Sequence, residues 1–333
     1  MRARLLERGA VMRRWRGGAW LVLGLVAGLT AACGAAIRGR AHRLERTLED
    51  CGFASGEIEV PGGRMRSWAG GQGPAVLLLH GFGGDVRWQL TDVMCALARD
   101  HRVIAPNLFG FGGSAADEPR AVGLLAQADA VAGLMDRLGV RRAAVVGTSY
   151  GGLVAYRLAT HHEDRVSRLV LVSSPGAVYT RDDLDAMLAG FGVASTRELF
   201  LPSDAKGVRR LLDLAYADAP WLPRPAARAA QRHFYGGPEQ RAADPRAHLL
   251  RTLELELTAL SPDAPRPTTP TLLIWGADDP VFPLPIAERL AAHLDARLEV
   301  IPHAAHAPNL EHPEAFLERL VPFLGADHGA PTD

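Results

Sequence analysis

The chain has 333 residues, enough for one large α/β domain with an insertion or for two small domains. Its 37 basic residues equal its 37 acidic residues, and this neutral balance gives no indication of nucleic-acid binding. The three cysteines form no Cys-x-x-Cys pair, which leaves a zinc or redox motif without support. We expect Cys51 and Cys95 to be separate thiols, although an oxidising compartment would allow them to pair.

The first 37 residues have the composition of a membrane-targeting segment. Residues 1–18 carry six arginines against one acid, and residues 19–37 carry no charge. About 20 apolar residues are needed to span the core of a bilayer. Since more positive charge precedes the apolar segment than follows it, we expect the start of the chain in the cytoplasm and the rest outside it.

Two routes of membrane attachment remain open. The apolar segment is either an uncleaved inner-membrane anchor or a bacterial lipoprotein signal that ends at residues 29–33, with Cys33 as the acylated residue. Thr30 stands where such signals usually have leucine. A buried core helix is a third interpretation, which the arginine-rich flank disfavours. Residues 1–50 are therefore excluded from the fold, with residues 38–50 expected as a short charged helical linker.

Short apolar segments and helical patterns alternate through most of the remaining chain. A hairpin is predicted first, followed by apolar segments that suit strands buried on both faces. Helical patterns between them favour a parallel, doubly wound sheet, an α/β fold. The predicted strands are 56–60, 64–69, 75–79, 102–105, 143–147, 168–173, 271–275 and 297–301, and the predicted helices are 88–99, 121–138, 150–161, 285–294 and 313–323.

One interval breaks the alternation. Residues 181–265 have helical spacing, several prolines and no convincing strand, so we expect a helical insertion between two strands of the sheet. Its placement suggests a lid, and a merely decorative extension is the alternative. The core is then expected at 51–180 and 266–325. Apolar residues of the insertion are candidates for an acyl pocket: Met187, Leu188, Phe191, Leu199, Phe200, Leu201, Leu211, Leu212, Trp221, Leu222, Phe234 and Tyr235.

Residues 147–151, Gly-Thr-Ser-Tyr-Gly, lie between a strand-like and a helix-like segment and fit G-x-S-x-G. Such a turn exposes the serine Oγ at a helix N-terminus, which favours developing negative charge. Ser149 is therefore a candidate nucleophile. A glycine-rich turn at 80–84 supplies a candidate oxyanion site, formed by the backbone amides of Phe82 and Tyr150, while His80 is expected to be structural.

A serine nucleophile also requires a base and an orienting acid. Asp278 and Asp279 follow a late predicted strand, and both qualify as the acid. His303 and His306 follow the next strand, and either qualifies as the base. The chain order Ser, Asp, His is the order of this type of fold.

The motifs occur in an order that resembles the α/β-hydrolase superfamily, specifically lid-bearing serine esterases and lipases. The resemblance covers residues 57–325 and rests on five segments: HGFGG (80–84), PNLFGFGGS (106–114), GTSYGG (147–152), WGADDPVFP (275–283) and HAPNLEHPEAF (306–316). The family pattern G-x-x-D implies Asp279 as the acid. The family's Glu-x-Pro after the histidine implies His306 as the base, which makes His303 and His312 bystanders.

Two positions depart from the family pattern, with Asn107 in place of the usual Asp and Ala305 in place of the usual Gly. Neither removes a member of the triad. A serine nucleophile in place of aspartate argues against the related haloalkane dehalogenases and epoxide hydrolases. The resemblance implies acyl transfer through an acyl-enzyme, with no metal and no organic cofactor.

The chain also resembles membrane-anchored monoacylglycerol lipases and secreted bacterial lipases. We therefore expect hydrolysis of acylglycerols or similar short- to medium-chain esters. One alternative is a carbon–carbon bond hydrolase of aromatic ring-cleavage products, which would require arginine deep in the pocket, with Arg197, Arg209 and Arg210 as candidates. An alternative of another class is a non-catalytic, membrane-tethered binding protein, disfavoured because every triad member is present.

Overall fold

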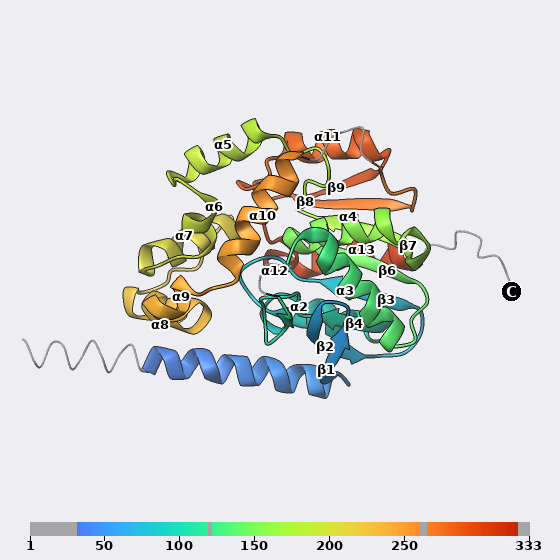
Figure 1. Ribbon diagram of the computed structural model, residues 1–333, viewed down its shortest axis with the longest axis horizontal. Helices are drawn as coiled ribbons and strands as arrows, with labels where there is room; N and C mark the ends of the chain where they lie inside the picture. Colours follow the sequence, from blue (N-terminus) through green and yellow to red (C-terminus); the bar gives the residue numbers. More distant parts are fainter. Residues whose placement is uncertain (1–31, 119–121, 260–264, 326–333) are drawn as a thin grey trace, which may run out of the picture.

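The computed structural model describes residues 32–118, 122–259 and 265–325, and it contains a nine-stranded sheet in the order β1-β2-β4-β3-β6-β7-β8-β9, with β5 paired to β2 (Figure 1). The first two strands are antiparallel to each other, and β2 is antiparallel to β4. The neighbouring strands are parallel through the rest of the sheet, in the order β4, β3, β6, β7, β8 and β9. The strands are β1 (Ala54–Val60), β2 (Gly63–Gly70), β3 (Ala75–Leu79), β4 (Arg102–Pro106), β5 (Ala115–Ala116), β6 (Ala143–Thr148), β7 (Val166–Val172), β8 (Thr271–Gly276) and β9 (Arg297–Ile301).

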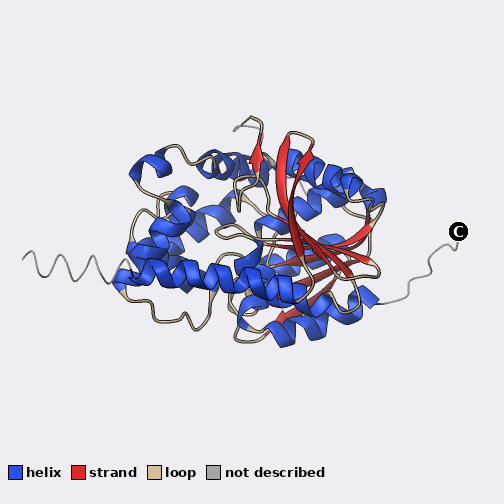
Figure 2. Ribbon diagram, turned by 90° about the horizontal axis from the view of Figure 1, so that it is seen from below, coloured by secondary structure: helices blue, strands red, loops and turns tan. Residues whose placement is uncertain are grey.

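Helices cover both faces of this sheet, as the view in Figure 2 shows. The covering helices are α2 (Val86–Leu97), α3 (Leu124–Arg137), α4 (Tyr150–His161), α11 (Leu284–Leu294), α12 (Pro308–Glu311) and α13 (Pro313–Gly325), with a 3-10 turn at Glu163–Arg165. Successive strand side chains point to opposite faces, so Leu77 and Val145 pack with α3, α4 and α11. Val76 and Val146 pack with α2 and α13 on the other face. Continuous apolar strands therefore fill two cores, as the α/β prediction requires.

A group of helices is inserted in the chain between β7 and β8, which are neighbouring strands of the sheet. They are α5 (Arg181–Phe191), α6 (Thr196–Phe200), α7 (Ala205–Ala215), α8 (Arg224–Tyr235), α9 (Pro238–Ala242) and α10 (Arg246–Ala259), and we call them the helical insertion. Figure 1 shows them gathered at one end of the molecule. The sequence itself marks where two of these helices begin: Thr180 and Asp183 form a capping box at the start of α5, and Asp204 caps the start of α7. Whether the insertion moves as a lid stays a prediction.

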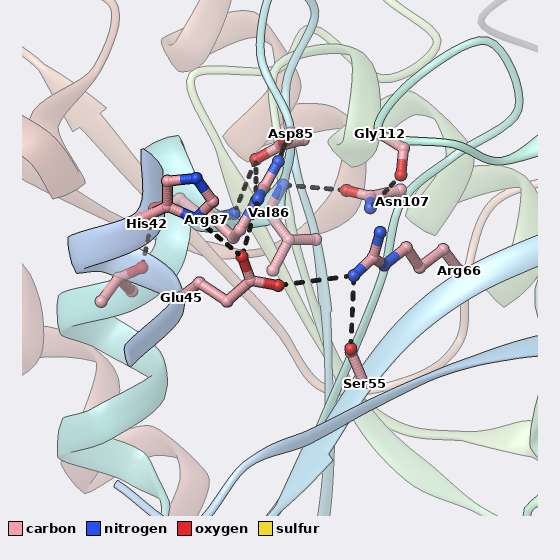
Figure 3. A network of polar contacts seen from close by, with 10 residues as sticks. His42, Glu45, Ser55, Arg66, Asp85, Val86, Arg87, Asn107 and Gly112 are labelled. Carbon is pink, nitrogen blue, oxygen red and sulfur yellow. Dashed lines mark hydrogen bonds and ion pairs between the residues drawn. The ribbon is translucent and has the colours of Figure 1, made fainter. Parts of the chain in front are cut away.

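Residues 32–50 form a helix, as expected for residues 38–50, but the helix packs on the domain, which corrects their exclusion from the fold. Leu48 is fully buried against the core that contains α2. Figure 3 shows Glu45 between two arginines, with ion pairs of 3.5 Å to Arg66 of β2 and 3.6 Å to Arg87 of α2. Sequence reasoning treated this charged segment as a linker because its few apolar residues make contact only once the sheet has folded.

The expectation of separate thiols is also wrong, since Cys51 and Cys95 form a disulfide. The N-terminal helix ends beside α2, and this packing brings the two Cα atoms to 5.5 Å, within the range that a disulfide bridges. Cys33 is a free thiol. Across the described ranges, no helix is long and apolar enough to cross a membrane. The predicted membrane segment, residues 19–37, lies outside the described residues except for 32–37, which are helical.

Candidate active site

Ser149 occupies the sharp turn between β6 and α4, at the carboxyl edge of the parallel strands. Its backbone has φ 53° and ψ −117°, a strained conformation for a residue with a side chain. The turn requires glycine at position 147, because a Cβ there would lie 2.4 Å from the carbonyl oxygen of Gly151. The amide of Ser149 donates to the carbonyl oxygen of Val172 on β7 at 2.8 Å, which fixes the turn to the sheet.

The structure brings Ser149, Asp279 and His306 together. His306 Nε2 lies 2.8 Å from Ser149 Oγ, and His306 Nδ1 lies 3.0 and 3.1 Å from the two carboxylate oxygens of Asp279. With its proton on Nδ1, the neutral ring donates to Asp279 and accepts from the Ser149 hydroxyl. This arrangement has the connectivity of a nucleophile, a general base and an orienting acid.

Burial distinguishes Asp279 from Asp278 and His306 from His303. The Asp279 carboxylate is fully buried, and its Oδ1 accepts hydrogen bonds from the amides of Val281 and Phe282. These amides orient the carboxylate toward His306. Asp278 and His303 are exposed, and among the described residues neither forms a hydrogen bond with the Ser149 side chain. The geometry therefore favours the same residues as the motif spacing, and their catalytic role stays a prediction that the experiments below test.

Phe82 and Tyr150, the proposed oxyanion donors, line the same cavity as Ser149. In the described part of the chain, neither backbone amide donates to another residue, so both remain available. The loop that carries Phe82 is held by Gln89, whose side chain accepts from the amide of Gly81 at 2.8 Å and donates to its carbonyl at 3.0 Å. Sequence reasoning missed Gln89, because no motif marks it.

His80 has the structural role that was expected for it. Its Nδ1 donates to the Gly81 carbonyl and its Nε2 accepts from the amide of Leu108, so the neutral ring connects two loops. Burial lowers the pKa of His80. Asn107 connects the same region, since its side chain accepts from the amide of Val86 and donates to the Gly112 carbonyl (Figure 3).

Glu311 also has a role that sequence reasoning missed, since it was named only as part of the Glu-x-Pro motif. One carboxylate oxygen accepts from the amide of Ala305 at 2.5 Å, directly before His306. The other oxygen accepts from the amide of Ala217 at 2.6 Å, in the loop after α7 of the helical insertion. Glu311 therefore fixes the histidine loop and joins it to the insertion.

A cavity of about 50 Å³ opens at Ser149 and is almost entirely apolar. The insertion contributes Met187 and Phe200, as predicted, together with Leu184 of α5 and three leucines of α10 that were not predicted. The other apolar candidates of the insertion do not line this cavity. Its remaining walls are formed mainly by Leu153, Tyr179, Val281 and Phe282, and the α10 leucines are Leu250, Leu253 and Leu257. The lining contains no basic residue, and Glu254, beside Thr196, is its one carboxylate.

A larger cavity of about 520 Å³ lies on the other side of the 80–84 loop. Gly83 and Gly84 form one wall, and the C-terminal end of α8 with Phe234 and Tyr235 forms another. Arg246 also lines it, and its guanidinium is paired with Asp244 at 2.6 Å. This cavity is more polar than the one at Ser149. Within the described ranges, no group of three or more His, Cys, Asp or Glu side chains is arranged to hold a metal ion.

Comparison with known proteins agrees with this fold. The family model described as the alpha/beta hydrolase fold matches residues 74–313. This chain belongs to the α/β-hydrolase fold family. Among curated proteins, 2-hydroxymuconate semialdehyde hydrolase of Pseudomonas sp. (strain CF600) is 30% identical over 286 residues, which cover 80% of this chain and 93% of that protein.

Solved structures give two kinds of similar hydrolase. A membrane phospholipase A, described as a bacterial virulence factor, has a TM-score of 0.73 at 26% identity and covers 94% of this chain and 98% of its own. A meta-cleavage product hydrolase of Pseudomonas fluorescens IP01 has a TM-score of 0.68 at 25% identity and covers 80% of this chain and 96% of its own. The chain is therefore a hydrolase of the α/β fold, and its relatives act on more than one bond type.

Proposed function

We propose that this hydrolase cleaves carboxylic esters, with acylglycerols or other short- to medium-chain lipid esters as substrates. The observation that carries the proposal is the apolar cavity at Ser149, which has no basic residue in its lining. Entry of an uncharged acyl chain into such a site is favourable by about 25 cal/mol per Å² of apolar surface that it buries. A carboxylate would lose its hydration there without finding a cation.

The mechanism follows from the positions of the three polar side chains. His306 takes the Ser149 proton through Nε2 while Oγ attacks the ester carbonyl, and Asp279 stabilises the charged ring. The amides of Phe82 and Tyr150 donate to the tetrahedral oxyanion. The alcohol leaves with the proton from His306, and a water molecule activated by the same ring then releases the acid.

The two cavities suit the two parts of an amphipathic ester. The apolar cavity would take the acyl chain, and the more polar cavity beyond Gly83 and Gly84 would take a polar alcohol. At about 50 Å³ the apolar cavity is far smaller than the roughly 300–1,000 Å³ of typical ligand sites. We therefore propose that the helical insertion acts as a lid, with α10 moving to admit the chain.

Sequence similarity favours a second candidate, carbon–carbon bond hydrolysis of ring-cleavage products, because curated relatives at 30% identity carry that activity in their names. The three candidate arginines do not support it. Arg197 bonds the Arg241 carbonyl, Arg209 bonds the Leu222 carbonyl, and Arg210 pairs with Glu198. None lines the cavity at Ser149, and Glu254 there would repel an acidic substrate. A non-catalytic binding protein would have no need for the hydrogen-bonded triad.

We further propose attachment to a bacterial membrane, with the hydrolase domain outside the cytoplasm. The charge pattern of residues 1–37 supports this, and so does the Cys51–Cys95 disulfide, since disulfides persist in oxidising compartments. The similarity to the membrane phospholipase A, which covers 94% of the chain, also supports this proposal. The meta-cleavage product hydrolase covers 80%.

The test compares the two substrate classes on the full chain in detergent. Hydrolysis of p-nitrophenyl esters from acetate to palmitate is measured beside hydrolysis of a 2-hydroxy-6-oxo-dienoate, with Ser149→Ala as the inactive control. We expect kcat/KM for the best ester to exceed that for the dienoate by at least about 100-fold, the cost of an unpaired charge in an apolar site. Faster turnover of the dienoate would overturn the ester proposal in favour of the second candidate.

A further inference from the structure

The exposed face of α8 carries a stripe of arginines. Arg224, Arg228 and Arg232 are spaced four residues apart, which places them along one side of the helix, and all three are exposed. No acidic residue occurs between positions 219 and 238. Within the described part of the chain, none of the three guanidinium groups forms an ion pair or a side-chain hydrogen bond. The stripe is therefore a concentrated, uncompensated positive charge.

An exposed tryptophan lies directly before this stripe. Trp221 is 86% exposed in the loop between α7 and α8, whereas the buried face of α8 packs Ala227 and Tyr235 into the insertion. Exposed tryptophans are costly in water and are enriched at the interface between bilayer and water, where the ring lies among the headgroups. A helix with exposed arginines and an exposed tryptophan in the loop before it has the composition of an interfacial membrane contact.

The N-terminal helix lies beside the end of α8 and runs below α8 in Figure 1. Arg40 lies 5.9 Å from the centre of the Trp88 ring, which packs edge-on against His233 of α8 at 6.3 Å. Burial lowers the pKa of His233, and the nearby charge of Arg38 contributes to the lowering. Arg38 directly follows the predicted membrane segment, residues 19–37, and Arg40 is two residues further along. A helix rises 1.5 Å per residue, so Arg38 is only roughly 9 Å from residue 32, which belongs to the predicted membrane segment. The end of α8 therefore lies close to the predicted point of membrane attachment.

We propose that Trp221 and the α8 arginines form a docking surface for a bilayer rich in anionic phospholipid. The stripe would contact the phosphate groups and Trp221 would enter the headgroup layer. The proposal rests on the proposed membrane attachment and is independent of ester hydrolysis. Docking would also turn the larger cavity toward the lipid, because His233 and Trp88 line that cavity beside the docking surface.

Quenching of Trp221 by lipid tests the proposal. The full chain carrying Ser149→Ala, which prevents consumption of the vesicle lipids, is reconstituted into vesicles that contain brominated phosphatidylcholine with or without phosphatidylglycerol. The protein has six tryptophans, so the same measurement on Trp221→Phe isolates the signal of Trp221. We expect quenching of Trp221 in the anionic vesicles, little in the zwitterionic ones, and loss of the difference in 1 M salt, where the Debye length falls to about 3 Å.

Replacing Arg224, Arg228 and Arg232 together by glutamine is expected to lower the docking equilibrium constant on the order of 100-fold, since each basic residue near an anionic surface contributes about a fivefold change. The matched control replaces three exposed arginines near the starts of β4 and β6, at the end of α3 and in the adjacent turns: Arg99, Arg137 and Arg141. This control removes the same charge and is expected to retain the quenching.

Three results would overturn the proposal. They are equal quenching of Trp221 in neutral and anionic vesicles, no quenching attributable to Trp221, and a control variant as defective as the stripe variant. If the stripe instead binds a second copy of the chain, sedimentation in detergent would show a dimer that the stripe variant loses, with no dependence of quenching on lipid charge.

Discussion

Glu311 is the residue whose contribution to the site is most open to test, because it accepts hydrogen bonds from the amides of Ala305 and Ala217. Glu311→Gln keeps the size of the side chain but replaces one acceptor with a donor facing an amide. We expect kcat for a short ester to fall about 10- to 100-fold with little change in KM, since a shift of about 1 Å in His306 costs that much. Glu318→Gln, an exposed position on α13, is the control. A change in KM alone would contradict this role.

His80 predicts a specific dependence of stability on pH. Burial lowers its pKa in the folded state below the unfolded value of about 6.5. Both states are neutral above that value, and below it the unfolded chain binds a proton that the folded chain does not. The free energy of unfolding should therefore fall as the pH drops below about 6.5, by at most about 1.4 kcal/mol per pH unit from this group.

The measurement for His80 is urea unfolding between pH 7.5 and 5.0. His80→Gln is expected to show a shallower fall in stability over this range than the unsubstituted chain. His303→Gln, an exposed position, should leave the slope unchanged. An identical slope in all three proteins would show that His80 does not titrate in this way.

At the scale of individual residues, the sequence allowed prediction of Ser149, Asp279 and His306 because each follows a strand within a recognisable motif. Gln89 and Glu311 could not be predicted in their roles, since no motif marks Gln89 and Glu311 contacts a segment distant in sequence. Glu311 reaches across 94 residues to Ala217. Such contacts exist only after the elements have packed, and no local pattern encodes them.

The N-terminal helix is expected to depend on the disulfide for its attachment to α2. Cys51→Ser with Cys95→Ser should lower the free energy of unfolding by about 2–4 kcal/mol, because the bridge closes a loop of 44 residues in the unfolded chain. Denaturant unfolding with and without reductant measures this loss. Cys33→Ser is the control, since that thiol is free. The double variant should keep its turnover of short esters, and equal stability of all variants would contradict the prediction.

Helix α10 should set the preferred acyl length. Leu253 lines the apolar cavity, and Leu253→Ala enlarges it. We expect the ratio of decanoate to butyrate kcat/KM to rise about 10-fold or more, because each additional buried methylene is worth about 1–3 kcal/mol in an apolar site. Leu255→Ala, on the exposed side of the same helix, should leave the ratio unchanged. Equal ratios in both variants would place the acyl chain elsewhere.

At the scale of elements, strands such as Ala75–Leu79 and helices such as Tyr150–His161 were predicted to within a residue or two. Apolar runs and turn residues are local signals, so these boundaries are encoded locally. The short strand β5 and the packing of residues 41–50 were not predicted. Both depend on partners in β2 or α2, and the disulfide was missed for the same reason.

The whole molecule combines a site common to several hydrolase chemistries with an N-terminal region and an arginine stripe that favour a membrane setting. The fold class was predictable from the alternation of strands and helices, and the family model over residues 74–313 confirms it. The bond that is cleaved was not predictable from the fold, because the same triad geometry serves esters and ring-cleavage products. The lining of the cavity, which only the folded chain assembles, supports the choice of esters.

The most direct test of this account is detection of the acyl-enzyme. The full chain is mixed with p-nitrophenyl octanoate, quenched in acid within the first turnovers, and analysed by intact and peptide mass spectrometry. The account predicts one octanoyl group, carried on Ser149 and absent from Ser149→Ala. Release of p-nitrophenol by folded protein with the octanoyl group on another residue, or no ester cleavage at all, would contradict it.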